Sequence, residues 1–202
     1  MERFDLSIPP KKNKLLEASL SLMLSKGYHG TTVDEICSEA GVTKGSFFHY
    51  FKSKEDAGMA AIHYFEKLQS YLMGEAGFDH AADPWDKLQS YLDFFVALSH
   101  RPDSPKSCLT AIMTQEMSDV NEDFRALCDE KFLINAKPLK DILDEVIVTY
   151  PPIVPIDSQH LSEFFLSTYQ GALILSRAKK SRSLIERNVE HYRRYLNYVF
   201  NK

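Results

Sequence analysis

The sequence predicts an all-helical protein with about nine helices, and two observations lead to this prediction. Apolar and polar residues do not alternate with the two-residue period of a strand for long enough to propose a sheet. Helix starts are instead marked by a Thr, Ser or Asp with an acidic residue three positions later, the pattern of a capping box. With 202 residues, 44% of them hydrophobic, the chain can bury a sizeable core.

The individual helices follow from these start signals and from the prolines. Capping pairs occur at Thr32 with Glu35, Ser53 with Asp56, and Asp83 with Asp86. Pro84 and Pro105 stand at first helical positions, where the missing N–H costs little. We therefore expect helices over residues 11–26, 32–40, 44–50, 54–74, 84–100, 105–117, 121–148, 158–179 and 183–200. Pro138 predicts a kink in the seventh helix, and three prolines within residues 150–157 predict a loop.

Composition and single-residue patterns exclude several classes of protein. The N-terminus lacks the apolar centre of a signal peptide and no apolar run reaches about 18 residues, so we expect a cytoplasmic protein with no membrane partner. Cys37, Cys108 and Cys128 form neither a disulfide framework nor a metal pair. The seven histidines form no HExxH motif or cluster, and no GxSxG or P-loop spacing occurs. We therefore expect no cofactor, no metal and no enzyme activity.

Residues 31–54 show the sequence pattern of a helix-turn-helix. In the first short helix Val33, Ile36, Cys37 and Ala40 form one apolar stripe at i, i+3, i+4 and i+7. Gly41 can take the left-handed conformation that ends this helix. Thr43 can cap the second helix, in which Phe47 and Phe51 share one face and should be buried.

The opposite face of the second short helix suits the floor of a DNA major groove. Gly45 and His49 point away from the core there, with Ser46 and Phe48 at the flanks. Three lysines surround this face with no acid between residues 42 and 54: Lys44, Lys52 and Lys54. Ordinary packing of two short helices with solvated lysines has the same spacing, so the pattern by itself leaves both interpretations open.

The segment GYHGTTVDEICSEAGVTKGSFFHYFKSKEDA, preceded by the amphipathic LLEASLSLMLSKG, resembles the DNA-binding domain of TetR-family transcriptional regulators. Later in the chain YQGALILSRA is similar to a pattern in many members, and SCLTAIMTQEMSD resembles the sixth helix of one subgroup. The resemblance implies a DNA-binding domain over residues 1–55 and a helical ligand-binding and dimerisation domain over residues 56–202. It further implies a homodimer on a palindromic operator, most simply a repressor released by a small-molecule effector.

The resemblance also implies roles for individual residues. The residues expected to contact the DNA are Thr43, Gly45, Phe48 and His49. The phosphate backbone of the DNA would be bound by Lys44 and Lys54, and Thr32 would add a further phosphate contact. Many members have Tyr where this chain has Phe48 and His49, so base preference does not carry over. We expect Lys54→Ala to reduce the salt slope of DNA binding by about one unit.

The remaining residues predict a ligand pocket and a dimer interface. Apolar residues with flexible Met side chains predict a pocket formed by Phe65, Leu68, Tyr91, Phe95, Cys108, Ile112, Met113, Glu116 and Tyr169. Such stripes are more often plain core, and Glu116 either favours a cationic ligand or is simply solvated. The last two helices predict a dimer interface of Leu161, Phe164, Phe165, Thr168, Ile185, Val189, Tyr192 and Leu196, with burial within one chain as the alternative.

Two other functions remain open at this point. A helical adaptor that binds only protein would keep the amphipathic helices but leave the lysine-edged face around His49 unexplained. A regulator that senses oxidants or electrophiles through Cys108 is the second, with Lys106 two residues earlier able to lower the pKa of the thiol.

The distribution of charge changes what the net charge of −4 and the pI near 6.0 imply. A whole-chain excess of acid argues against a nucleic-acid partner. Residues 1–58, however, hold eight basic and eight acidic residues, and residues 42–54 carry three lysines and no acid. The charge therefore predicts modest, salt-sensitive DNA affinity that depends on two DNA-binding domains per dimer.

Overall fold

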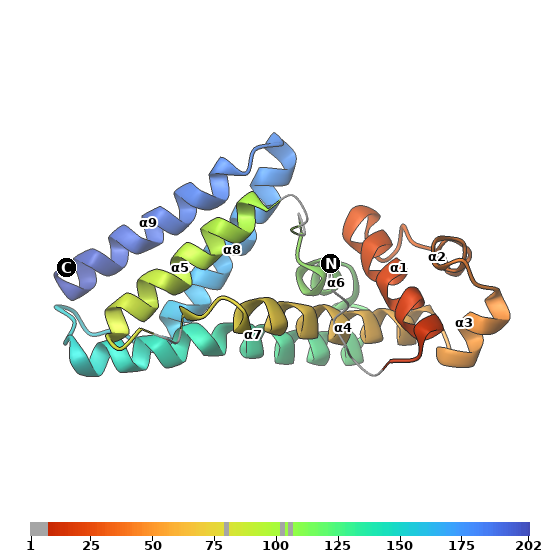
Figure 1. Cartoon of the computed structure of the whole chain (residues 1–202), viewed down its shortest axis with the longest axis horizontal. Coiled ribbons are helices and arrows are strands. Elements are labelled where there is room, and N and C mark those ends of the chain that lie inside the picture. The colour runs from red at the N-terminus through yellow and green to blue at the C-terminus, as the bar shows by residue number, and fades with distance from the viewer. Residues whose placement is uncertain (1–7, 79–80, 102–103, 105–106) are drawn as a thin grey trace. The chain divides into compact units, whose positions relative to one another are not determined.

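The structure is a computed structural model that describes residues 8–78, 81–101, 104 and 107–202. These residues form nine α-helices and no strand, which confirms the predicted fold class (Figure 1). The helices are α1 (Pro10–Lys26), α2 (Val33–Ala40), α3 (Lys44–Tyr50), α4 (Lys54–Gly74), α5 (Pro84–His100), α6 (Leu109–Met117), α7 (Glu122–Thr149), α8 (Ser158–Lys179) and α9 (Ser183–Phe200). None of them is both long and apolar enough to span a lipid bilayer.

The chain divides into two compact units. Unit 1 consists of Met1–Glu75 and Cys108–Lys131, and unit 2 of Ala76–Ser107 and Phe132–Lys202. This division differs from the predicted boundary after residue 55, because α4 and α6 both pack against α1. The predicted assignment of ligand binding and dimerisation to residues 56–202 stays a prediction.

Most helix bounds agree with the sequence, and α6 is the exception. It begins at Leu109 and not at residue 105, because Cys108 is extended (φ −101°, ψ 123°) and forms the N-cap. Pro105 and Lys106 lie outside the described residues. Helix α7 continues through Pro138, and the kink predicted there stays a prediction.

Unit 1 is built around α1, which packs against α2, α3, α4 and α6. Leu15, Ile36 and Phe47 are fully buried in its core. Where α4 passes Tyr28 and Phe124, a Cβ on Gly58 would lie 3.2 Å from each ring, so glycine allows this close approach. The two rings meet edge to face with centroids 5.6 Å apart.

In unit 2, α9 packs against both α5 and α8 around an aromatic cluster. Phe165 is central in this cluster: its ring lies 5.0 Å from that of Tyr192, 5.2 Å from Phe95 and 5.9 Å from Tyr91. The Tyr192 hydroxyl donates to the Leu161 carbonyl at 2.9 Å, which satisfies its buried polar atom.

This packing involves most of the residues of the predicted dimer interface. Six of the eight predicted residues are buried within the chain, namely Leu161, Phe165, Ile185, Val189, Tyr192 and Leu196. Helix α9 packs against α5 and α8 of its own chain, which agrees with the alternative of burial within one chain, and a dimer contact for these six residues stays a prediction. Phe164 is exposed and Thr168 half-buried, so these two retain accessible surface.

Candidate nucleic-acid interface

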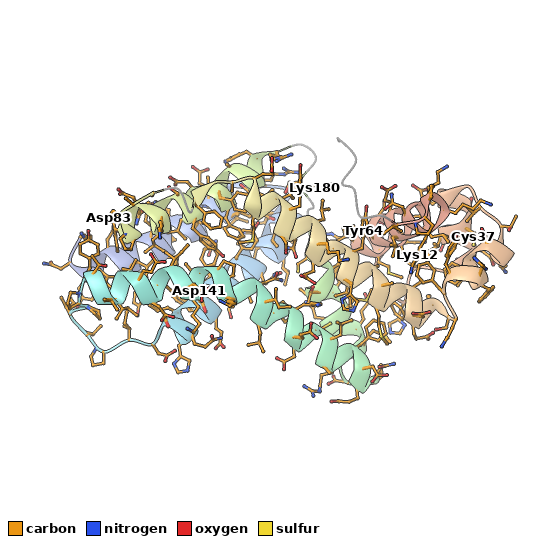
Figure 2. All side chains as sticks on the ribbon, turned by 60° about the horizontal axis from the view of Figure 1, so that its bottom comes forward. Lys12, Cys37, Tyr64, Asp83, Asp141 and Lys180 are labelled. Carbon is orange, nitrogen blue, oxygen red and sulfur yellow. The ribbon has the colours of Figure 1, made fainter. Side chains whose placement is uncertain are left out.

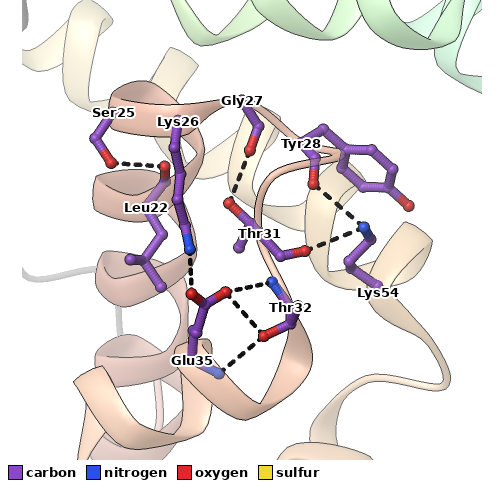
Figure 3. Close-up of polar contacts among 9 residues, drawn as sticks. All are labelled: Leu22, Ser25, Lys26, Gly27, Tyr28, Thr31, Thr32, Glu35 and Lys54. Atoms are coloured by element: carbon purple, nitrogen blue, oxygen red, sulfur yellow. Dashed lines mark hydrogen bonds and ion pairs between the residues drawn. The ribbon is translucent and has the colours of Figure 1, made fainter.

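The start of α2 is held by a complete capping box. The Thr32 hydroxyl oxygen accepts a hydrogen bond from the Glu35 N–H at 3.3 Å, and the Glu35 carboxylate accepts one from the Thr32 N–H at 2.9 Å. Lys26, in the last turn of α1, also donates to Glu35 (Figure 3). Hydrogen bonds to the Glu35 carboxylate lower its pKa from 4.5 to about 2, and the bond from Lys26 contributes more than those from Thr32. One carboxylate thus joins the end of α1 to the start of α2.

The turn between α2 and α3 has the geometry that its sequence predicts. Gly41 adopts the left-handed conformation (φ 63°, ψ 39°) and ends α2. The Thr43 hydroxyl then caps α3 by accepting from the Ser46 N–H at 3.2 Å. Phe47 and Phe51 are buried with ring centroids 5.5 Å apart, which fixes the orientation of α3 on the unit.

The outer face of α3 is open. Phe48 is 55% exposed, His49 and Gly45 are exposed, and Ser46 is half-buried. A Cβ on Gly45 would meet only the Thr43 hydroxyl oxygen, at 3.8 Å, so the backbone there can be approached closely from outside. The structure therefore presents the residue types that the sequence predicts on this face, while their contact with DNA stays a prediction.

The three lysines of this region are in different situations. Lys44 forms an exposed ion pair with Asp34 at 2.7 Å, and the hydrogen bond from Lys44 to Asp34 raises the pKa of the lysine. Solvent weakens an ion pair that is this exposed, so a phosphate can replace Asp34 as the partner of Lys44. Lys52 is exposed just before α4, where its backbone N–H donates to the Asp56 carboxylate at 2.8 Å.

Lys54 points into the protein. Its ammonium donates to the Tyr28 carbonyl at 3.2 Å and to the Thr31 carbonyl at 3.1 Å, and lies 4.2 Å from the centroid of the Tyr28 ring (Figure 3). An ammonium has three N–H donors, so two are used to hold the loop between α1 and α2. The phosphate contact predicted for Lys54 stays a prediction, but fixing this loop is the role that its contacts show.

Glu116, on α6, makes a contact that the sequence did not indicate. Its carboxylate accepts from the His29 N–H at 2.7 Å, in the loop between α1 and α2. Gly27 adopts a positive φ of 84°, and a Cβ there would overlap this carboxylate. The two partners are 87 residues apart in the sequence. No local pattern reveals such a contact, although a glycine at the end of α1 was a weak signal for an unusual backbone.

The predicted pocket residues divide between the two units. Phe65, Leu68, Cys108, Ile112, Met113 and Glu116 belong to unit 1, and Tyr91, Phe95 and Tyr169 to unit 2. Phe95 and Tyr169 meet with ring centroids 4.8 Å apart. Burial of Phe65, Cys108 and Met113 agrees with a core role, and a ligand contact for any member of this set stays a prediction. Within the described part of the chain, no group of three or more metal-ligating side chains occurs.

Comparison with known families decides the identity of the chain. The model of bacterial regulatory proteins of the tetR family matches residues 15–56, which include α2 and α3. The model of the C-terminal domain of LmrA/YxaF-like transcriptional regulators matches residues 84–191, more than half of the chain. The chain belongs to the TetR family. It is a DNA-binding transcriptional regulator and not an enzyme, as the sequence predicted.

Relatives of this TetR-family chain include named regulators. The transcriptional repressor DhaR from Mycobacterium sp. strain GP1 is 29% identical over 192 residues, covering 95% of this chain and 91% of DhaR. The transcriptional regulator AcuR from Cereibacter sphaeroides is 35% identical over 112 residues, so the chain spans about half the length of AcuR (51%).

Solved structures agree on the fold. A TetR-family regulator from Agrobacterium tumefaciens superposes with a TM-score of 0.79 at 19% identity, over 92% of this chain and 98% of that one. The reduced form of Escherichia coli NemR gives a TM-score of 0.75 at 22% identity, over 94% and 97% of the two chains.

Proposed function

We propose that this regulator is a repressor that binds a palindromic operator as a homodimer and is released by a small-molecule effector. The observation that carries the DNA-binding part is the outer face of α3, where exposed Phe48 and His49 flank a backbone that Gly45 leaves open. The repressor mode is supported by the relatives DhaR and NemR, both named as repressors. Operator DNA lies in the cytoplasm, which is therefore the compartment that we propose.

In this proposal α3 enters the major groove. Phe48 and His49 contact base edges together with Thr43 and Ser46, and Phe48 can pack on a thymine methyl group. Lys44 exchanges Asp34 for a phosphate, and Lys52 adds a second backbone contact. Two cations per DNA-binding domain give modest affinity, which makes a dimer with two such domains necessary for stable binding.

The dimer is supported by an apolar surface on unit 2 that its own chain does not cover. Phe164, Thr168, Gly171 and Leu175 lie at i, i+4, i+7 and i+11 on α8. The exposed Phe164 ring contacts the exposed Tyr195 ring of α9 at 5.8 Å. A Cβ on Gly171 would meet nothing within 4 Å, so another helix can approach there. Exposed apolar side chains that lie on one face of a helix are typical of a protein interface.

Release by an effector is supported by the contact of α6 with the loop between α1 and α2. Glu116 holds the His29 N–H, so a shift of α6 changes the support of the DNA-binding helices. We expect Glu116→Ala to weaken operator binding about fivefold or more, whereas the exposed Gln115→Ala on the same helix leaves it unchanged. Equal affinities of both variants would show that this contact does not couple α6 to DNA binding.

The experiment that tests DNA binding selects an operator from a random pool of double-stranded DNA by repeated gel shift. We expect a palindromic consensus, which would also exclude the protein-only adaptor; a pool without enrichment would contradict the proposal. Gly45→Ala should then weaken binding at least about tenfold, because the added methyl group holds the backbone away from the DNA, while the stability of the fold is unchanged or rises by up to about 1 kcal/mol. Gly74→Ala, another helical glycine with open space at its Cβ, is the matched control.

The dimer has its own test. Leu175→Asp places a charge on the exposed apolar surface of α8, and we expect sedimentation to shift from two chains to one. Val148→Asp, also at an exposed apolar position in unit 2, should leave the mass unchanged. A wild-type protein that sediments as a single chain of 23.2 kDa at micromolar concentration would contradict the dimer.

A further inference from the structure

A cavity of about 390 Å³ lies within unit 2, between the end of α5, the end of α8 and the start of α9. Three basic side chains line it, Arg177, Lys180 and Arg182. Four serines also line it, and Leu173, Ile185 and the ring of Tyr169 supply an apolar wall. The volume falls in the range of about 300–1,000 Å³ that is typical of small-molecule sites.

The charged side chains in the described lining of this cavity are all basic. Its lining contains no carboxylate among the residues that the structure describes. Between Glu163 and Glu186 the sequence has four basic residues and no acid. Glu186, the first carboxylate of α9, lies 3.5 Å from the His100 ring nitrogen. Several cations around a walled space whose described lining holds no carboxylate favour an anion.

The basic side chains are positioned by the ends of the helices. Arg182 donates from one guanidinium nitrogen to the Ser99 carbonyl at 2.7 Å and to the Arg101 carbonyl at 2.5 Å, which holds it against the end of α5. Arg177 donates to the Ser107 hydroxyl at 2.9 Å. Lys180 ends α8 in a left-handed conformation (φ 50°) and is exposed in the turn to α9 (Figure 2). Carbonyls orient the guanidinium of Arg182 without neutralising its positive charge.

We infer that this cavity binds a small organic anion, with a carboxylate or phosphate monoester on the basic side and a short apolar body against Leu173 and Ile185. Arginine forks and an ammonium are the donors that proteins use for such groups, with serine hydroxyls as additional donors. Anion binding by the cavity is independent of the proposed function, but a role of that anion as the effector rests on it. From Glu116 the sequence suggested a cationic ligand, whereas this cavity favours an anion. Glu116 does not line the cavity, because its carboxylate accepts a hydrogen bond from the His29 N–H in unit 1.

The test compares two neighbouring lysines. Lys180 lines the cavity and Lys179 does not, yet both are exposed, carry the same charge and stand at the end of α8. Calorimetric titration of the full chain uses hexanoate, hexyl phosphate and hexylamine as probes. We expect both anions to bind and hexylamine not to bind. Lys180→Gln should weaken anion binding about tenfold, and Lys179→Gln should leave it within about twofold, because only one removes a charge-assisted contact.

The outcomes decide the proposal in either direction. A preference for hexanoate or for hexyl phosphate identifies the headgroup, and both support the site. Equal binding of hexylamine and hexanoate, or equal effects of the two substitutions, would overturn it. Operator affinity of both variants is measured in parallel: loss of operator affinity in Lys180→Gln with unchanged hexanoate binding would assign the cation to DNA and overturn the anion site. Normal operator binding with no anion binding would overturn this inference alone and leave the proposed function standing.

Discussion

The α2–α3 surface and the cavity of unit 2 both gather basic side chains, but they are assembled over different lengths of chain. The α2–α3 surface is fixed by contacts three residues apart, such as Thr32 with Glu35 and Thr43 with Ser46. The cavity depends on Arg182 meeting the Ser99 carbonyl, 83 residues away. Local hydrogen bonds specify the first region within one segment, whereas the second exists only after three helices have packed.

The two regions also use their cations differently. In the α2–α3 region Lys44 faces an acid and Lys54 faces backbone carbonyls, which leaves Lys52 as an exposed cation. At the cavity Arg182 is held by carbonyls while keeping its charge toward a space whose described lining has no carboxylate. The number of basic residues in a sequence segment therefore does not tell which basic side chains are bound to groups of the protein itself and which can bind a ligand.

The largest effect that we predict concerns packing in unit 2. Leu196 is fully buried, so Leu196→Ala should lower the free energy of unfolding by about 2–5 kcal/mol, through reduced apolar burial and a new cavity. Tyr198, two residues later, is 69% exposed, and Tyr198→Ala should cost far less stability. Urea denaturation measures both. A Leu196→Ala variant of normal stability that fails to dimerise would instead support the predicted interface at Leu196.

The next effect separates two of the lysines. Lys54→Ala removes two charge-assisted hydrogen bonds to the loop between α1 and α2, so we expect it to lower the free energy of unfolding by about 1.5–3 kcal/mol. Thermal unfolding monitored by circular dichroism measures this change. A variant as stable as the wild type would show that the two carbonyls are equally well solvated without Lys54.

Lys52→Ala is the matched control, because its side chain is exposed. It should leave stability unchanged and reduce the slope of log affinity against log salt by about 0.9 for each phosphate that Lys52 neutralises in the wild-type complex. If Lys54→Ala changes only the salt slope and Lys52→Ala changes nothing, the phosphate contact belongs to Lys54 and not to Lys52.

Much of the α2–α3 region was predictable because its determinants are local. Capping at Thr32 and Thr43, the left-handed Gly41 and burial of Phe47 all follow from residue types at fixed spacing, and the structure contains each of them. The inward direction of Lys54 was not predictable. The carbonyls that it binds lie 23 and 26 residues earlier, and only tertiary packing brings them within reach.

Unit 2 was predictable in its helices but not in how their faces are used. The apolar stripes of α8 and α9 lie on the helices where the sequence places them, but the sequence left open whether their own chain or a partner covers them. An apolar stripe indicates that a helix face is buried, but it does not indicate whether the same chain or a partner chain covers that face. The difference lies in residues such as Phe164 and Leu175, which are exposed beside a covered stripe.

A smaller effect tests how locally the α2–α3 region is specified. Thr32→Ala removes the hydroxyl that accepts from the Glu35 N–H, and should lower the free energy of unfolding by about 1 kcal/mol. Thr32→Ser keeps the hydroxyl and should retain most of this stability. Chemical denaturation of the three proteins measures the difference, and equal stability of the alanine and serine variants would show that the cap contributes little.

The smallest effect is the pH dependence that Glu35 contributes. Hydrogen bonds from Lys26 and Thr32 to its ionised carboxylate lower its pKa to about 2 in the folded chain, below the ordinary value of 4.5. Because the folded pKa is the lower one, this stabilisation is fully present above about pH 4.5 and is lost as the pH falls toward about 2. Glu35→Gln should therefore be less stable than the wild type at neutral pH, and the difference should shrink across that acid range. Glu39→Gln, at an exposed acid on the same helix, serves as the control in urea titrations at several pH values. A stability difference for Glu35→Gln that is constant from neutral to acid pH would mean that the carboxylate is not stabilised in its ionised form, and that its ion pair with Lys26 contributes little to joining α1 and α2.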